Sequence, residues 1–129
     1  MRPLGYWVLA VAVLYALCAA TVCFAKKTFP WDSGPATIDV SKYPQQMKDT
    51  YTKLFSVKCK QCHTLARPIN STYVLQTEWD AYTKKMVRKP GAKISEAERR
   101  LIVGFLSYDA KVRKKALYDK KAAAAAGGA

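Results

Sequence analysis

The residues best suited to chemistry lie together in the stretch FSVKCKQCH, where Cys59 and Cys62 are three apart and His63, the only histidine, follows directly. On a helical turn, residues three apart lie on nearly the same face, and the next residue is rotated by about 100°. Cys59 and Cys62 could thus form thioethers with the two vinyl groups of one haem, while His63 points its imidazole at the iron. The C-x-x-C-H spacing therefore predicts one covalently attached haem c.

Three other interpretations of this motif stay open. A dithiol oxidoreductase needs only the two cysteines, and such proteins usually carry a nearby βαβ pattern, which this sequence lacks. A structural zinc site needs a fourth ligand, and because no other Cys or His follows residue 25, carboxylates would have to complete it. The third alternative is coincidence. Haem is favoured because the motif, an export signal and a helical pattern agree with one another.

The sixth position of a haem iron would have few candidate ligands. Because His63 is the only histidine, bis-histidine ligation within one chain is impossible, which leaves a methionine thioether, a lysine amine or an open site holding water. Met47 belongs to an apolar helix face, whereas Met86 lies where a predicted helix ends, so Met86 is the predicted ligand. A core methionine at Met86 and lysine ligation by Lys84 or Lys85 at high pH are the alternatives.

The first 25 residues have the pattern of an export signal. Arg2 is followed by an uncharged, mostly apolar run over residues 4–25, and cleavage after it would place the small Cys23 at position −3. The alternative is an uncleaved anchor, because the run is about long enough to span a bilayer. Lys26 and Lys27 would then lie on the exported side, against the positive-inside bias. We therefore expect residues 1–25 to be a signal peptide.

The charge of the chain is strongly basic, with 22 Lys and Arg against 9 Asp and Glu and a formal net charge of +13. Such a chain attracts acidic proteins or anionic membranes, although a basic surface also serves solubility alone. An exported chain without a nucleic-acid-binding motif or interleaved aromatic and basic residues is not expected to bind nucleic acid. The expected partners are proteins with acidic docking surfaces.

Helical patterns dominate the rest of the chain, so the predicted fold class is all-α. Residues 26–42 are rich in proline and small polar residues and predict an irregular N-terminal arm. A first helix is expected after Ser41, because apolar residues recur every four positions on the way to Cys59. These are Tyr43, Met47, Tyr51 and Phe55.

Two further helices are expected after a loop over residues 64–76. The sequence TEWD predicts an N-cap at Thr77 and a helix through Met86, stopped by Pro90-Gly91. Ser95 and Glu98 form a capping box that begins a long C-terminal helix. Its predicted apolar stripe comprises Leu101, Ile102, Phe105 and Leu106, with Tyr108 and Val112 as extensions. Residues 117–129 form a low-complexity, alanine-rich tail whose end we expect to be disordered.

Several residues beyond the haem motif make the sequence similar to class I c-type cytochromes, in particular the small bacterial monohaem type. An aromatic residue, Phe55, stands four before the first cysteine of the motif. The segment EAERRLIVGFL, Glu96 to Leu106, resembles the start of the family's C-terminal helix, and Met86 lies a little over a dozen residues before Leu101, as the family's methionine ligand does. The resemblance spans residues 43–116.

This resemblance implies a cytochrome c-like fold of three main helices around one covalent haem, with His63 and Met86 as axial ligands. It implies an electron carrier of a respiratory chain that shuttles one electron between redox partners, and not an enzyme. The expected location is the periplasm, with membrane anchoring towards the periplasm as the alternative. A haem enzyme or sensor with an open sixth position and a C-x-x-C dithiol oxidoreductase are the alternative functions.

The chain also departs from the family. The segment between His63 and Met86 is shorter than in mitochondrial-type cytochromes. The family's proline, whose carbonyl orients the haem histidine, therefore has only Pro68 as a counterpart, in a different place. Trp79 and Tyr73 are candidates to pack on the macrocycle or bond a propionate, and simple core packing is the alternative for both.

Overall fold

The computed structural model describes residues 28–128, and this part of the chain is helical without any strand. The predicted all-α class is confirmed. The α-helices are α2 (Gln45–Thr50), α3 (Ser56–Lys58), α4 (Ala66–Asn70), α5 (Gln76–Val87), α6 (Glu96–Arg113) and α7 (Lys115–Gly127). Short 3-10 turns cover Pro30–Asp32 and Cys59–Gln61, and a π-helical turn covers Tyr51–Phe55.

The predicted signal peptide, residues 1–25, lies outside the described residues. Within residues 28–128, no helix combines the length and the apolar character that crossing a membrane requires.

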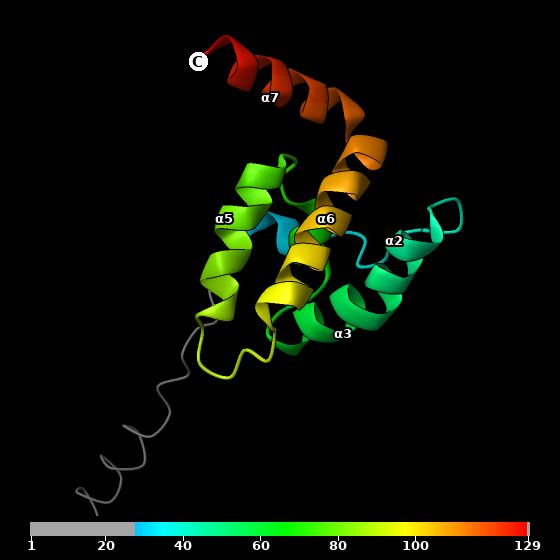
Figure 1. The fold of residues 1–129 in the computed structure, drawn as a ribbon, viewed down its shortest axis with the longest axis vertical. Helices are drawn as coiled ribbons and strands as arrows, with labels where there is room; N and C mark the ends of the chain where they lie inside the picture. The colour runs from blue at the N-terminus through cyan, green and yellow to red at the C-terminus, as the bar shows by residue number, and fades with distance from the viewer. Residues whose placement is uncertain (1–27, 129) are drawn as a thin grey trace, which may run out of the picture.

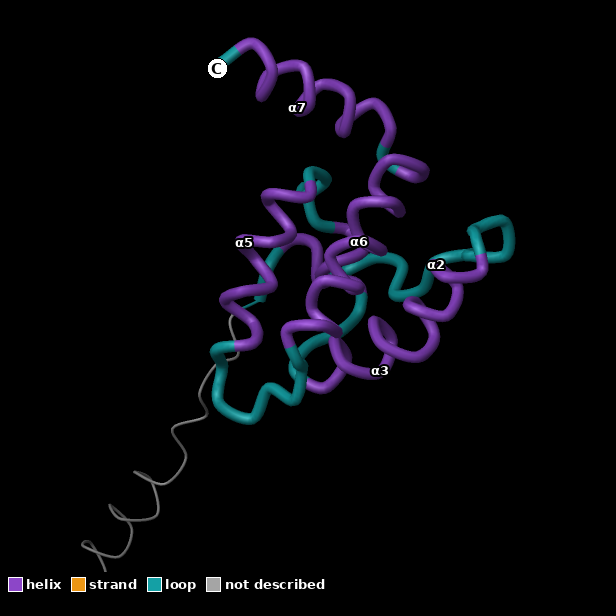
Figure 2. The backbone as a smooth tube through the Cα atoms, in the orientation of Figure 1, coloured by secondary structure: helices purple, strands orange, loops and turns teal. Residues whose placement is uncertain are grey.

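The predicted first helix is present and runs without interruption from Gln45 to Gln61, as the continuous tube through α2 and α3 shows (Figure 2). Its middle is the π-helical turn, which the sequence pattern did not indicate. The spacing of four residues still holds across this turn, because the rings of Tyr51 and Phe55 stack with centroids 5.9 Å apart. The π turn therefore keeps both aromatic rings on the face that meets α6.

The core forms where this first helix and α5 pack against α6 (Figure 1). Phe55 is fully buried, and its ring lies 5.3 Å from that of Phe105 on α6. Tyr51 contacts the same ring from the preceding turn, at 5.6 Å. The buried cluster comprises Ile38, Tyr43, Phe55, Ile69, Trp79, Ile102, Val103, Phe105 and Leu106.

The capping box of α6 is present as predicted. The Ser95 hydroxyl accepts a hydrogen bond from the Glu98 N–H at 3.2 Å, and the Glu98 carboxylate accepts one from the Ser95 N–H at 2.7 Å. The predicted stripe is wrong at two positions, because Leu101 is 45 % exposed and Val112 is 52 % exposed. Val103 occupies the buried face instead, since that face is set by the two elements that pack on α6 and not by apolar residues alone.

The two shorter helices differ from the sequence-based expectation. The predicted loop after His63 contains α4, five residues long. Helix α5 begins at Gln76, and its N-cap is Leu75, so the predicted N-cap at Thr77 is wrong. The Glu78 side chain performs the capping, because its carboxylate accepts hydrogen bonds from the N–H groups of Val74 and Leu75 at 2.9 and 3.0 Å.

The alanine-rich tail is helical through Gly127, and Ala129 lies outside the described residues, so the expected disorder at the very end stays a prediction. The α6 helix ends at Arg113. Its C-cap Lys114, with a φ of −119° and a ψ of 36°, turns the chain, and α7 leads away from the body (Figure 1). Lys121 connects α7 to the rest of the molecule through an ion pair with Glu78 at 2.5 Å. The Lys114 ammonium donates a hydrogen bond to the Ser71 carbonyl.

We predict that Phe55→Ala lowers the free energy of unfolding by about 3–5 kcal/mol, because it opens a cavity under the Phe105 ring. Leu101→Ala, a deletion of an exposed apolar side chain in α6, changes it by about 0.5 kcal/mol or less. Chemical denaturation followed by circular dichroism measures both. Equal losses of unfolding free energy in the two variants would contradict the burial of Phe55 and the exposure of Leu101.

Candidate functional site

Two adjoining hollows lie between the first helix, α5 and the start of α6. The inner hollow has apolar walls that include Trp79, Ile102 and Leu106. The outer hollow has a volume of about 280 Å³ and lies over the 59–63 segment. Both are lined by Cys59, His63, Tyr82, Met86 and Ile94, so they form one continuous site.

The two cysteines of the motif differ in exposure. The 3-10 turn Cys59–Gln61 ends the first helix, and residues three apart in such a turn lie on the same side. Cys59 is partly buried and lines both hollows, whereas Cys62 is exposed and lines only the outer one. Both thiols are free. The local conformation thus presents both sulfur atoms to the outer hollow.

The His63 ring is oriented by its neighbour in the chain. Its Nδ1 lies 2.9 Å from the Thr64 carbonyl oxygen. Because a carbonyl only accepts hydrogen bonds, this contact places the hydrogen on Nδ1, so that in the neutral ring the lone pair is on Nε2. Pro68 has another role, since its carbonyl accepts a hydrogen bond from the Ser71 hydroxyl at 3.0 Å and its side chain lines the inner hollow.

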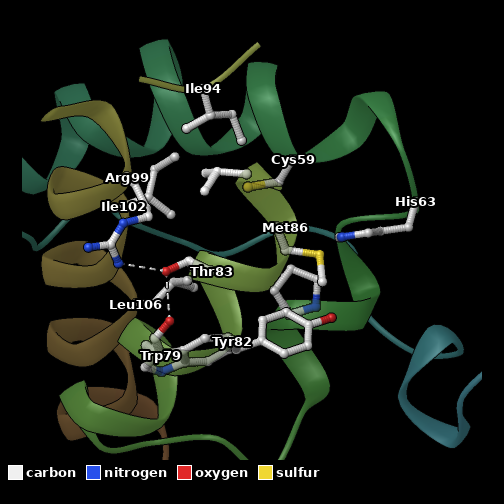
Figure 3. A pocket seen from close by; sticks show the side chains of 12 residues that line it. Cys59, His63, Trp79, Tyr82, Thr83, Met86, Ile94, Arg99, Ile102 and Leu106 are labelled. Atoms are coloured by element: carbon white, nitrogen blue, oxygen red, sulfur yellow. Dashed lines mark hydrogen bonds between the residues drawn. The ribbon is translucent and has the colours of Figure 1, made fainter. Parts of the chain in front are cut away.

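The two methionines of the described chain lie in different places. Met86, on the last turn of α5, lines both hollows, and Figure 3 shows its sulfur and the His63 ring directed into the same space. Met47 packs against the core cluster and lines neither hollow. The fold therefore brings Met86, and not Met47, to the residues of the C-x-x-C-H motif.

Arg99 is a residue of this site that sequence reasoning missed. It is only 3 % exposed, and it lines the inner hollow (Figure 3). Its guanidinium donates to Glu96 on its own helix at 2.6 Å, and to the Asp80 carboxylate and Thr83 hydroxyl of α5 at 2.7 and 3.1 Å. The hydrogen bonds that Arg99 donates to Glu96 and, second, to Asp80 raise the pKa of Arg99 above its usual range.

These contacts fix α5 against α6 one turn before Met86. The spacing of Glu96 and Arg99 within α6 is a visible sequence signal for part of this cluster. The contact with Asp80 joins two helices and could not be read from that spacing.

An aromatic cluster closes the inner end of the site. Tyr73 packs edge-on against Trp79 with ring centroids 5.5 Å apart, and Tyr82 contacts both rings. Among the side chains that the structure describes, the Trp79 indole N–H is the buried polar group left without a hydrogen-bond partner. Buried donors are nearly always paired, so this one points to an acceptor that the protein itself does not supply.

The opening of the site has a basic rim. Lys89 and Lys93 line the outer hollow, together with Lys58, and none of the described residues that line either hollow is Asp or Glu. Two lysines of this region are paired: Lys58 with Glu98 at 3.0 Å and Lys84 with Asp80 at 2.7 Å. The rim suits a partner with a negatively charged surface.

The site gives little support to the alternatives for the cysteine pair. Burial, and to a smaller extent the nearby Cys62, raises the pKa of Cys59 to about 12. Cys59 is therefore poorly suited to be the attacking thiolate that a dithiol oxidoreductase needs at neutral pH. Within residues 28–128, no three side chains of His, Cys, Asp and Glu gather as metal ligands, so a zinc site lacks its ligand set there.

Comparison with protein-family models, with curated proteins and with solved structures finds no match to this chain.

We predict that, in folded protein prepared without haem, iodoacetamide alkylates Cys62 at least about ten times faster than Cys59 at pH 8. The reason is that burial leaves only about one Cys59 thiol in ten thousand ionised at that pH. Peptide mass spectrometry at successive times measures both rates, and denaturant should make them similar. Faster reaction of Cys59 in protein with native circular dichroism would contradict this description.

Proposed function

We propose that this chain is an exported single-haem c-type cytochrome that shuttles one electron between redox partners. The observation that carries the proposal is the convergence of Cys59, His63 and Met86 on one apolar site, although Met86 comes from a separate helix. The all-α fold and the resemblance of residues 43–116 to class I c-type cytochromes support it. We further propose the periplasm as its location, either free or attached through an uncleaved N-terminal segment.

The chemistry of the residues present fits a covalent haem. Cys59 and Cys62 supply two free thiols to the same hollow, which is what two thioether bonds require. His63 offers its Nε2 and Met86 its thioether, a ligand pair that suits a low-spin iron. The unpaired indole N–H of Trp79 would find an acceptor in a propionate carboxylate. The outer hollow, of about 280 Å³, and the apolar walls of the inner hollow behind it offer a surface on which one face of a macrocycle could pack.

When bound, the haem supplies the redox chemistry, a reversible one-electron change between Fe(III) and Fe(II). The protein residues would hold and shield it. The Thr64 carbonyl keeps the hydrogen of His63 on Nδ1, so that Nε2 would be the ligand atom. Arg99 and Thr83 hold the turn of α5 that carries Met86. Ile102 and Leu106 exclude water from the inner wall, and apolar surroundings with a thioether ligand favour a raised potential.

The partners of such a carrier would be redox proteins with acidic docking surfaces. The basic rim of the outer hollow would meet them where the distance to the iron is short, and electrostatic attraction would speed their encounter. Lys89 and Lys93 are the best candidates for this contact, because they line the hollow itself. We expect no nucleic-acid partner.

We predict that protein matured with c-type haem has a sharp reduced α-band, and that its ferric form has the weak thioether-to-iron charge-transfer band near the red edge. Met86→Ala should abolish the charge-transfer band and lower the midpoint potential, because the sixth ligand is lost. Visible spectroscopy and potentiometry measure both.

Met47→Ala is the matched control, because it removes the other methionine of the described chain from the core without touching the hollows. It should keep the charge-transfer band. A band that survives Met86→Ala would contradict Met86 ligation and favour an iron with an open or different sixth position.

A further inference from the structure

The N-terminal arm, predicted to be an irregular segment, is fastened to the candidate site by one ion pair. Arg67 of α4 donates from Nε to Asp32 Oδ1 at 2.5 Å and from Nη2 to Asp32 Oδ2 at 2.7 Å. This two-pronged geometry is among the stronger ion pairs that proteins form. Both side chains are shielded, with 13 % of Arg67 and 17 % of Asp32 exposed. Although 35 residues separate them, the pair joins the arm to the helix that follows His63.

The same ion pair places Phe29. The Phe29 N–H donates to Asp32 Oδ2 at 2.8 Å, which closes the 3-10 turn Pro30–Asp32. The Arg67 guanidinium lies over the Phe29 ring, 4.7 Å from its centroid. The Trp31 ring stacks on the Phe29 ring, with centroids 5.4 Å apart. Phe29 lines the outer hollow together with Cys62 and His63. The arm thus contributes an aromatic side chain to the site.

Further contacts keep the following residues of the arm on α4. Asn70 donates to the carbonyls of Ser33 and Pro35 at 3.3 and 3.0 Å. Gly34 lies between them with a φ of 108°, and a Cβ at this position would come within 3.1 Å of the Asn70 amide nitrogen. The Ile38 N–H then donates to the Tyr51 hydroxyl at 3.1 Å. The segment 29–38 therefore follows a defined path over α4 and the first helix.

We propose that residues 29–35 form a fastened wall of the site, in which Arg67 and Asp32 are positioning residues that hold Phe29 over the side where Cys62 and His63 lie. The wall keeps water and small solutes away from His63. For the cytochrome function proposed above, on which this consequence rests, exclusion of water disfavours the more highly charged ferric state and so raises the potential.

Two variants separate this role from a simple effect of charge. Asp32→Asn removes a negative charge near His63, and Arg67→Gln removes a positive one, so direct electrostatics would shift the potential in opposite directions. Release of the arm would instead lower the potential in both variants. Phe29→Ala, which leaves both charges in place, should also lower it. Asp49→Asn is the matched control, because it breaks an exposed ion pair with Lys53 on the first helix.

The experiment measures hydrogen exchange and the midpoint potential on protein matured with haem. In Asp32→Asn and Arg67→Gln we expect amides of residues 29–38 to exchange about tenfold faster or more, with α5 and α6 unchanged, and the potential to fall in both. Asp49→Asn should change neither quantity. If the exchange of residues 29–38 is unchanged, the Arg67–Asp32 ion pair does not hold the arm. If the potential rises in Asp32→Asn, the arm does not act by excluding water from His63.

Failure of the cytochrome proposal can be recognised separately. If the chain carries no haem, exchange over residues 29–38 still tests the fastening, and the rate at which diethyl pyrocarbonate modifies His63 takes the place of the potential. The wall predicts faster modification in Asp32→Asn, Arg67→Gln and Phe29→Ala than in Asp49→Asn. Equal rates in the four variants would overturn the proposal.

Discussion

The buried guanidinium of Arg99 is the interaction on which the arrangement of this site most depends. A charged side chain that is 3 % exposed is costly unless its donors are all used, and Arg99 uses them on carboxylates of α5 and α6 and on the Thr83 hydroxyl. These contacts can form only in one relative orientation of α5 and α6. They therefore set the rotation of α5 about its axis and its position along that axis. Met86, one turn beyond Thr83, takes its position from them.

Helix α6 supports the other half of the site as well. The first helix packs on it through Phe55 and Phe105, and the end of that helix, where Cys59 begins the motif, lines the same hollows as Met86 of α5. Tyr51 and Phe55 stack on one face across the π-helical turn, as residues four apart also do in an α-helix. Two segments distant in sequence therefore meet over one helix, and the thiols, the imidazole and the thioether converge.

Local signals predicted much of this molecule, and contacts distant in sequence account for most of what was missed. The capping box at Ser95, the spacing from Met47 to Phe55 and the helical turn at Cys59 depend on neighbours within four residues, and the structure has them. Tyr43, expected on the same helix, is buried but lies before the helix begins at Gln45. Leu101 was assigned to the buried stripe because apolar character does not reveal which face a partner covers.

The remaining features depend on pairs that periodicity does not detect. Arg99 meets Asp80 across 19 residues, and Arg67 meets Asp32 across 35. Each residue alone resembles an ordinary solvated charge, and only the fold gives it a role. Helix α4, which carries Arg67, was likewise concealed by Pro68 and the turn-forming residues after it. Met86 was predicted as the ligand from its place at a helix end and from the resemblance to cytochromes, but its position near the motif arises only when α5 packs against α6.

Covalent attachment of one haem to Cys59 and Cys62, as proposed here, can be measured as the mass of the protein expressed with a c-type haem maturation system. We expect an intact mass increased by one haem, a haem-bearing peptide that contains Cys59 through His63, and loss of the added mass in the Cys59→Ala/Cys62→Ala variant. A folded, colourless protein with the mass of the polypeptide alone would contradict it and return the two cysteines to thiol chemistry.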